Sequence, residues 1–289
     1  MQRSETVVVC GVTGRQGGAV ARHLLADGWH VRGLTRNAGG DEARAVAAKG
    51  VEVVQADMGD RPALDRALGG AYGVYSVQSF AIAGPEGEVA QGRNVADAAL
   101  AAGVRHFVYA SSGTGAPTGV PSWDTKVAVT EHIRSLGLPH TVLRPECFME
   151  IMTDKEFYPN VTAWHIMPNL AGSGTTIPWL AVDDLGAIAA KVFADPDRFI
   201  GQDIALAGDV QSLADCRAIW TKINGKPPRG FPMPVWLFKR VAGPSGTDLP
   251  IMWRWLRTGD VPKDPDTTRA IHPGALTVRQ WLERRGAAA

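Results

Sequence analysis

The stretch VVVCGVTGRQGGAV, residues 7–20, joins a β-branched run to an apolar helical pattern through spaced glycines. The run predicts a short buried strand, and the apolar residues after it recur at helical spacing. Glycines at such a crossover permit a tight turn and a close approach of the backbone to a pyrophosphate, whose charge the helix N-terminus attracts. The alternative is a merely structural turn. The residues expected to contact a dinucleotide here are Gly11, Thr13, Gly14, Arg15, Gln16 and Gly17.

Strand-like and helix-like patterns alternate from this stretch to Pro145. Such alternation implies right-handed crossovers and a mainly parallel sheet that is covered on both faces. We therefore predict an α/β fold, a Rossmann-type doubly wound parallel sheet. The expected strands are 6–11, 30–36, 51–57, 71–78, 105–112 and 138–145, and the expected helices are 17–29, 41–49, 61–70, 86–103 and 122–137.

The regular alternation fades after Pro145. Residues 151–180 are loop-like, 225–262 are rich in proline, tryptophan and methionine, and the tail 277–286 has a helical pattern. A helix at 182–194, a strand at 203–208 and a helix at 212–223 are expected between them. We predict a Rossmann domain of residues 1–150, joined by 182–208, and a smaller irregular C-terminal lobe of residues 151–181 and 209–289.

The composition narrows the class of protein. The 289 residues are 45% apolar and 20% charged, with a net charge of +1, so no electrostatic footprint for nucleic acid or an anionic membrane is present. No segment approaches the length of a membrane-spanning helix. Three scattered cysteines and no H-x-x-x-H spacing argue against a disulfide framework and a metal site. We expect a cytoplasmic protein that uses no metal.

The end of the second predicted strand bears on the choice of dinucleotide. NAD-binding chains place a carboxylate there for the ribose, but this strand ends LTRN, residues 34–37. Arg36 could bind an adenosine phosphate instead, and Arg15 could reach the same region, so NADP(H) is favoured. Arg36 could also be a solvated strand-end residue. Further candidate contacts are Asp57, Met58 and Gln78. Asp57 could instead cap its own loop, and Gln78 could be a turn residue.

Taken together, the motifs resemble the NmrA-like branch of the atypical short-chain dehydrogenases/reductases. The resemblance rests on GVTGRQGG at 11–18, LTRN at 34–37, ADMGD at 56–60, YASSG at 109–113, TVLRPECFME at 141–150 and IPWLAVDDLG at 177–186. It implies a Rossmann-type NADP-binding domain and a small lobe for substrate or partner. Members include quinone, phenylpropanoid and dye reductases, and regulators that bind NADP without evident turnover.

The chain departs from the wider superfamily at one catalytic position. Typical members carry Tyr-x-x-x-Lys with a serine on the preceding strand end. Here Ser122 stands at the tyrosine position, although Lys126, Ser111 and Ser112 are present. Tyr109, placed by a strand, is a doubtful substitute for the missing phenol.

Lys126 lies at the edge of an apolar stripe that includes Val129, Ile133 and Leu136. Its helix begins at the carboxyl edge of the sheet, where ligands of open α/β sheets bind, so Lys126 could hold the nicotinamide ribose and assist proton transfer. The alternative is a snorkelling surface lysine. Ser111 and Ser112 end a strand at the same edge and complete the predicted catalytic set.

The segment after the last strand of the first half could line the nicotinamide site. Pro145 and Phe148 are candidates, with core packing as the alternative, whereas a nucleophilic Cys147 is improbable. In the smaller lobe, tryptophans and methionines build either a core or a wall for a planar ligand, and PVWLFKR, residues 234–240, could meet a protein partner. The set comprises Trp164, Trp179, Trp236, Trp253, Trp255, Met167, Met233 and Met252.

These features predict an NADPH-dependent reductase of a small, apolar and planar acceptor such as a quinone or an activated carbonyl. The alternative is a non-catalytic NADP(H)-sensing regulator that binds a partner protein. A homodimer is compatible with either.

Overall fold

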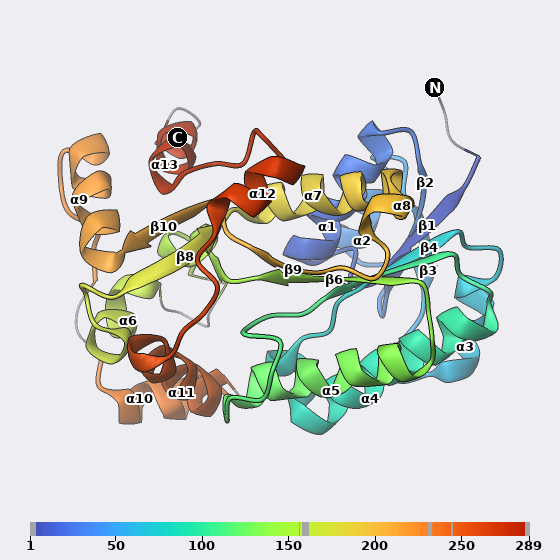
Figure 1. The fold of residues 1–289 in the computed structure, drawn as a ribbon, viewed down its shortest axis with the longest axis horizontal. Coiled ribbons are helices and arrows are strands. Elements are labelled where there is room, and N and C mark those ends of the chain that lie inside the picture. Colours follow the sequence, from blue (N-terminus) through green and yellow to red (C-terminus); the bar gives the residue numbers. More distant parts are fainter. Residues whose placement is uncertain (1–3, 156, 158–161, 231–232, 244, 287–289) are drawn as a thin grey trace.

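The computed structural model describes residues 4–155, 157, 162–230, 233–243 and 245–286. Parts of the expected loop-like segment 151–180 and of the proline-rich segment 225–262 lie outside these residues. The described chain forms a large parallel sheet between two layers of helices, with a smaller sheet at the end of the molecule away from the N-terminus (Figure 1). This architecture confirms the predicted Rossmann-type fold with a smaller second lobe.

The main sheet has seven parallel strands in the order β3-β2-β1-β4-β5-β6-β9. The chain moves outward on one side of β1 and then returns to its other side through β4. Ligands of open α/β sheets bind at such a switch point, outside the carboxyl ends of the strands. The strands are β1 (Thr6–Val9), β2 (His30–Thr35), β3 (Glu52–Gln55), β4 (Gly73–Ser76), β5 (His106–Ala110), β6 (His140–Pro145) and β9 (Asp203–Leu206).

Two helical layers bury the two faces of this sheet. Helices α1 (Arg15–Ala26) and α7 (Val182–Ala194) pack together on one face, where a β-carbon added at Gly186 would lie 2.7 Å from the Ala19 backbone. The other face is covered by α3 (Arg61–Leu68), α4 (Phe80–Ala101) and α5 (Pro121–Ser135), while α2 (Asp41–Ala47) links β2 to β3 (Figure 1). The central strands β1, β4 and β5 are buried on both faces, which suits their β-branched and aromatic residues.

The segment expected to be irregular contains more regular structure than its sequence indicates. A three-stranded sheet in the order β10-β8-β7 is made of β7 (Cys147–Phe148), β8 (Thr176–Leu180) and β10 (Asp209–Ser212). Pro168 within α6 and Pro178 within β8 obscured these elements. The remaining elements are η1 (Met149–Met152), α6 (Ala163–Ala171), α8 (Pro196–Phe199), α9 (Leu213–Asn224), α10 (Val235–Val241), α11 (Ser245–Thr258), α12 (Pro265–Ile271) and α13 (Val278–Gly286).

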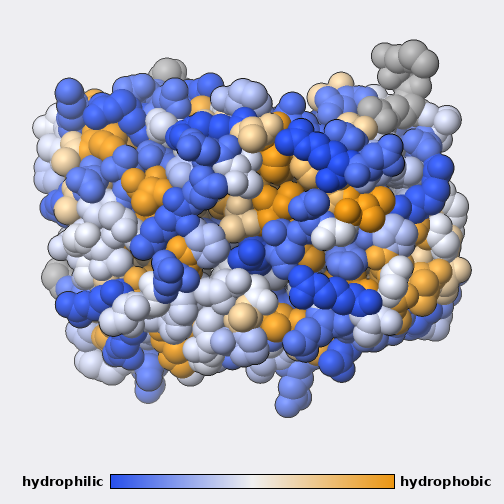
Figure 2. Space-filling view, in the orientation of Figure 1, coloured by the Kyte–Doolittle hydropathy of each residue, from blue (hydrophilic) through white to orange (hydrophobic). Residues whose placement is uncertain are grey.

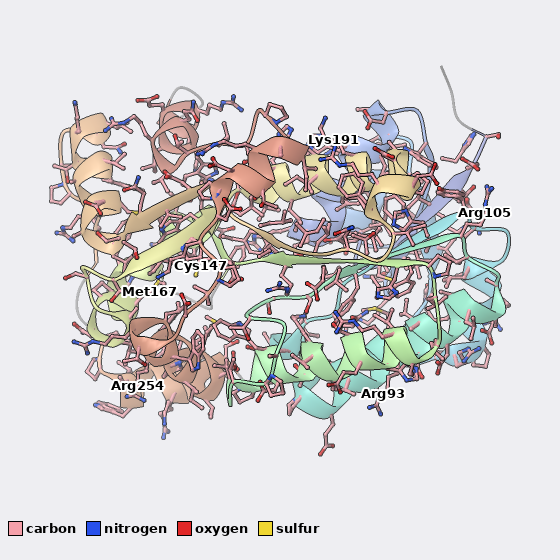
Figure 3. All side chains as sticks on the ribbon, viewed as in Figure 1. Arg93, Arg105, Cys147, Met167, Lys191 and Arg254 are labelled. Carbon is pink, nitrogen blue, oxygen red and sulfur yellow. The ribbon has the colours of Figure 1, made fainter. Side chains whose placement is uncertain are left out.

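The apolar residues of this part form a core that is continuous with the α1/α7 face of the main sheet. Trp179 and Trp253 are fully buried, so these two side chains build the core rather than a ligand wall. Figure 3 places Cys147 and Met167 at this end of the molecule. On the face shown in Figure 2, hydrophilic residues are interspersed with small apolar patches. Among the described residues, no helix combines the length and the apolar character needed to span a membrane.

Candidate functional site at the carboxyl edge of the sheet

The glycine crossover connects β1 to α1 at the switch point. Gly11 has a φ of 60°, a conformation that favours glycine, and its carbonyl accepts the Gly14 N–H at 2.9 Å. A β-carbon added at Gly17 would lie 2.3 Å from the Gly11 oxygen, so only glycine fits this contact. Helix α1 follows with no side-chain cap on Gly14 in the described structure, which leaves its first N–H groups for an anion.

The ends of β2 and β3 lie beside this crossover in the sheet order. Arg36 directly follows β2 and is exposed, and in the described part of the chain its guanidinium has no hydrogen bond or ion pair. Asp57 is also exposed and accepts the Gly59 N–H at 2.7 Å, so it closes its own turn. Arg36 is therefore available to a phosphate. Asp57 makes the contact expected of an aspartate that closes its own loop.

Arg15 contacts side chains of the segment after η1. Its guanidinium pairs with Asp154 at 2.5–2.8 Å and lies 5.4 Å from the centre of the Phe157 ring. The Phe157 ring in turn contacts Phe148, with 5.8 Å between ring centres. In this structure Arg15 thus links the glycine crossover to the segment after η1.

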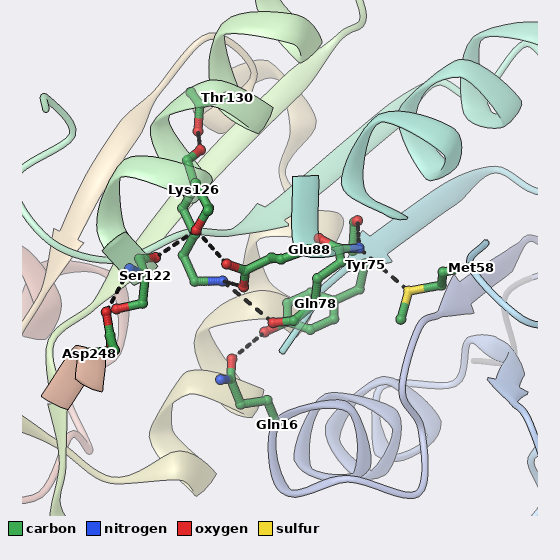
Figure 4. Close-up of polar contacts among 11 residues, drawn as sticks. Gln16, Met58, Tyr75, Gln78, Glu88, Ser122, Lys126, Thr130 and Asp248 are labelled. Carbon is green, nitrogen blue, oxygen red and sulfur yellow. Dashed lines mark hydrogen bonds and ion pairs between the residues drawn. The ribbon is translucent and has the colours of Figure 1, made fainter. Parts of the chain in front are cut away.

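Three of the predicted contact residues, Gln78, Met58 and Gln16, lie around the end of β4. Gln78 is 4% exposed, and its amide nitrogen donates to Ser76 Oγ at 2.9 Å and to Met58 Sδ at 3.5 Å, while its buried Oε1 has no partner in the described structure. Gln16, in the first turn of α1, accepts the Tyr75 hydroxyl at 3.4 Å. Figure 4 shows these side chains on one side of the same cluster as Lys126.

Lys126 is held by a buried glutamate that the sequence analysis did not select. Its Nζ lies 2.9 Å from Glu88 Oε1 and 3.4 Å from the Gln78 carbonyl oxygen (Figure 4). The Lys126 side chain is 13% exposed and that of Glu88 is completely buried, with Thr125 donating to its second oxygen at 2.5 Å. Lys126 is therefore not a snorkelling surface lysine, because its ammonium points inward to the Glu88 carboxylate on α4 and to the Gln78 carbonyl oxygen after β4.

The hydroxyl groups considered as partners of Lys126 in the predicted site differ in access. Ser111 is buried at the end of β5, and Ser112 is partly exposed. Tyr109 is completely buried, its hydroxyl has no partner in the described structure, and burial raises its pKa well above the ordinary value. Its ring cannot reach a substrate, which removes Tyr109 as a replacement for the missing phenol. Ser122 is partly exposed in the first turn of α5.

Ser122 is bound by a second acid absent from the predicted set, Asp248 of α11. The Asp248 carboxylate accepts the Ser122 backbone N–H at 2.8 Å, and the Ser122 hydroxyl also bonds to it. Asp248 is 3% exposed, and burial is the main cause that raises its pKa. The smaller lobe thus reaches the helix that carries Lys126.

The segment after β6 also contains an overlooked acid. Pro145 and Phe148 are buried, and Glu146 lies between them with a buried Oε1 that lacks a partner in the described residues. Burial raises the pKa of Glu146 to about 8, and desolvation raises that of Cys147 as well. The raised pKa of Cys147 disfavours its thiolate form, which agrees with the expectation that Cys147 is not a nucleophile.

One sequence signal for Glu88 exists. Glu88 occupies the apolar stripe of α4 together with Gly92, Val95 and Ala99, all of which are buried. A carboxylate on a buried stripe needs a partner, and Lys126 at the edge of the apolar stripe of α5 is that partner. No comparable local signal points to Asp248, whose contact spans 126 residues of sequence.

The glycine crossover, the switch point and the polar cluster at one sheet edge define a Rossmann-type α/β protein. The NmrA-like family model matches residues 3–281, and the chain belongs to this family.

Two kinds of relative are similar to the chain. An NmrA-like family domain-containing oxidoreductase from Aspergillus flavus is 29% identical over 255 residues, covering 80% of this chain and 76% of the relative. The negative transcriptional regulator Nmra is similar in structure, with TM-scores of 0.79 for its complex with NAD and 0.76 for that with NADP, at 23% identity over 99% of this chain and 97% of the regulator. An NADPH-dependent quinone oxidoreductase from Escherichia coli has a TM-score of 0.77 at 23% identity, over 96% and 99% of the two chains.

Proposed function

We propose that the chain binds a nicotinamide dinucleotide at the glycine crossover and reduces a small acceptor beside Lys126. The dinucleotide fits the residues present, because the Gly17 contact leaves no room for a side chain and the first N–H groups of α1 face an anion site. Gly11, Thr13, Gly14, Gln16 and Gly17 would hold the pyrophosphate side.

The dinucleotide is proposed to be NADP(H). Arg36 is an exposed guanidinium at the end of β2, suited to an adenosine phosphate, and no carboxylate stands there for a ribose. The regulator Nmra has structures with NAD and with NADP, so the preference of this chain depends on its own Arg36. Arg15 contributes to phosphate binding only after it leaves Asp154.

Further contacts are proposed to orient the nicotinamide end. Gln78 presents an unpartnered buried oxygen at the end of β4, and Pro145 and Phe148 provide apolar surface after β6. Met58 lies against Gln78, and Asp57 follows β3 on the adenine side. Small-molecule pockets combine apolar walls with a few placed polar groups, which these residues supply.

The position of Lys126 carries the proposal of catalysis. Its ammonium lies at the Gln78 carbonyl, at the edge where the nicotinamide ribose would lie, and Glu88 keeps a cation there. When bound, reduced nicotinamide supplies the hydride. Lys126 holds the ribose and favours negative charge on the acceptor oxygen, while Ser111 and Ser112 offer hydroxyl groups at the same edge. Because no accessible phenol is present, an activated, planar and apolar acceptor such as a quinone is favoured.

The second candidate function is a non-catalytic NADP(H)-responsive regulator. Ser122 replaces the phenol, and Trp236 on α10 is 68% exposed, as expected of a residue that meets a partner protein. The similarity to a negative transcriptional regulator is compatible with this alternative.

Oxidation of NADPH by a panel of quinones and carbonyl compounds tests the proposal. Wild type should turn over at least one acceptor, and Lys126→Met should lose most of that rate while still binding NADPH. Lys49→Ala, an exposed lysine after α2, is the control. Tight NADPH binding with no turnover of any acceptor would favour the regulator.

A further inference from the structure

Asp248 is a buried acid that is bound to the residue at the start of the Lys126 helix. It comes from α11 in the smaller lobe and is 3% exposed. Its carboxylate accepts the Ser122 backbone N–H at 2.8 Å (Figure 4), and a hydrogen bond from the Ser122 side chain lowers its pKa. Helix α5 has no side-chain cap from its own N-cap residue Val120, so Asp248 supplies this cap from a distant element.

The charges around Asp248 make it an unusual cap. Burial is the largest cause and raises its pKa, whereas the two hydrogen bonds from Ser122 lower it. Glu88 on α4 raises the pKa further, and Lys126 on α5 lowers it. The net direction is upward, so Asp248 takes up a proton more readily than an exposed aspartate does.

The Ser122 hydroxyl is more accessible than the Tyr75 and Tyr109 hydroxyls and the Glu88 carboxylate. Ser122 is partly exposed and precedes Lys126 by four residues, so both lie on one side of α5. Tyr75, Tyr109 and Glu88 are completely buried. In the proposed function the Lys126 ammonium, paired with Glu88, holds the ribose.

We propose that Ser122 and Asp248 form the proton-delivering pair of the reaction, with Ser122 as the catalytic residue and Asp248 acting through it. This inference rests on the proposed reductase function. After hydride reaches the acceptor, its oxygen takes the proton of Ser122 Oγ. The Ser122 oxygen takes the proton of the Asp248 carboxyl, and solvent returns a proton to Asp248. The smaller lobe would thereby supply the acid that position 122 itself lacks.

The first variants separate proton delivery from helix capping. Ser122→Ala keeps the backbone N–H bond to Asp248 but removes the hydroxyl, and Ser122→Thr keeps the hydroxyl. We expect kcat to fall about 100-fold in Ser122→Ala and less than about 5-fold in Ser122→Thr, since a positioned acid contributes about 10²–10⁴-fold. Equal rates for the two variants and wild type would overturn the proposal.

Asp248→Asn should lower kcat to a similar extent with an NADPH Kd within about twofold of wild type, and the double variant Ser122→Ala/Asp248→Asn should be no slower than either single variant. The rate of wild type should fall as pH rises through the pKa of Asp248, and Asp248→Asn should lose this limb. Asp264→Asn, which alters a helix-capping aspartate on α12, is the control and should leave the profile unchanged. An unchanged pH profile in Asp248→Asn would contradict the proposal.

A measurement without turnover completes the test. Carbon-13 NMR of the aspartate carboxyls in the coenzyme-free protein, assigned with Asp248→Asn, should show Asp248 titrating above the ordinary aspartate range. Titration at or below that range would remove Asp248 as a proton donor. Failure of wild type to reduce any acceptor would defeat the reductase function itself, whereas turnover that is insensitive to Ser122→Ala would defeat only this inference.

Discussion

Removal of the charge on Glu88 should expose how strongly the Lys126 site depends on its buried partner. In Glu88→Gln the amide can still accept from Lys126 but no longer neutralises it. The Lys126 side chain is only 13% exposed and the Glu88 side chain is completely buried, so an unpaired ammonium would remain in a poorly hydrated place. Breaking a buried ion pair from one side costs about 3–5 kcal/mol, and the retained amide hydrogen bond should reduce the loss to about 2–3 kcal/mol.

The assay is a double-mutant cycle in urea unfolding. Lys126→Met leaves Glu88 and Thr125 without the cation, and we expect a similar loss from it. The double variant Glu88→Gln/Lys126→Met removes both charges and should lose at least about 1.5 kcal/mol less than the sum of the single variants. A coupling below about 0.5 kcal/mol would refute the reasoning, since it would mean that the two groups do not stabilise each other.

Three further changes test other parts of the molecule. Gly17→Ala should abolish measurable coenzyme binding or destabilise the fold by roughly 3 kcal/mol or more, because the added carbon would lie 2.3 Å from the Gly11 oxygen. Gly18→Ala is the milder control, since its added carbon would lie 3.2 Å from the nearest backbone oxygen. Arg36→Asp should shift the ratio of Kd values for NADPH and NADH toward NADH, and an unchanged ratio would remove Arg36 from the site. Glu146 has a pKa raised to about 8 by burial, so its proton favours the folded state and stability is lost as pH rises from about 4.5 toward 8. Glu146→Gln should remove this loss and unfold at higher urea than wild type at pH 9 but not at pH 4, and equal midpoints at pH 9 would contradict it.

The sheet could be predicted from the sequence because its signals are local. The glycine crossover needs close contacts among residues within one turn, such as Gly11 with Gly17, and each parallel strand is a short apolar run. The predicted strand at 203–208 is β9, which pairs with β6 at the edge of the main sheet. The small sheet was obscured because β7 is only two residues long and β8 contains Pro178.

The polar cluster could be predicted only in part. Lys126 and Gln78 were identified from their places at strand and helix ends, and the structure brings them together. Glu88 and Asp248 were missed because their contacts with α5 span 38 and 126 residues of sequence and depend on how the helices pack. Local patterns do not encode such packing, although the carboxylate on the buried stripe of α4 was a usable signal.

Isothermal titration calorimetry of the wild-type chain with NADPH and with NADH tests the central claim most directly. The account predicts saturable binding at one site per chain, tighter for NADPH, because the amide-lined glycine crossover receives a pyrophosphate and Arg36 lies at the end of β2. Absence of saturable binding for both coenzymes would contradict the account.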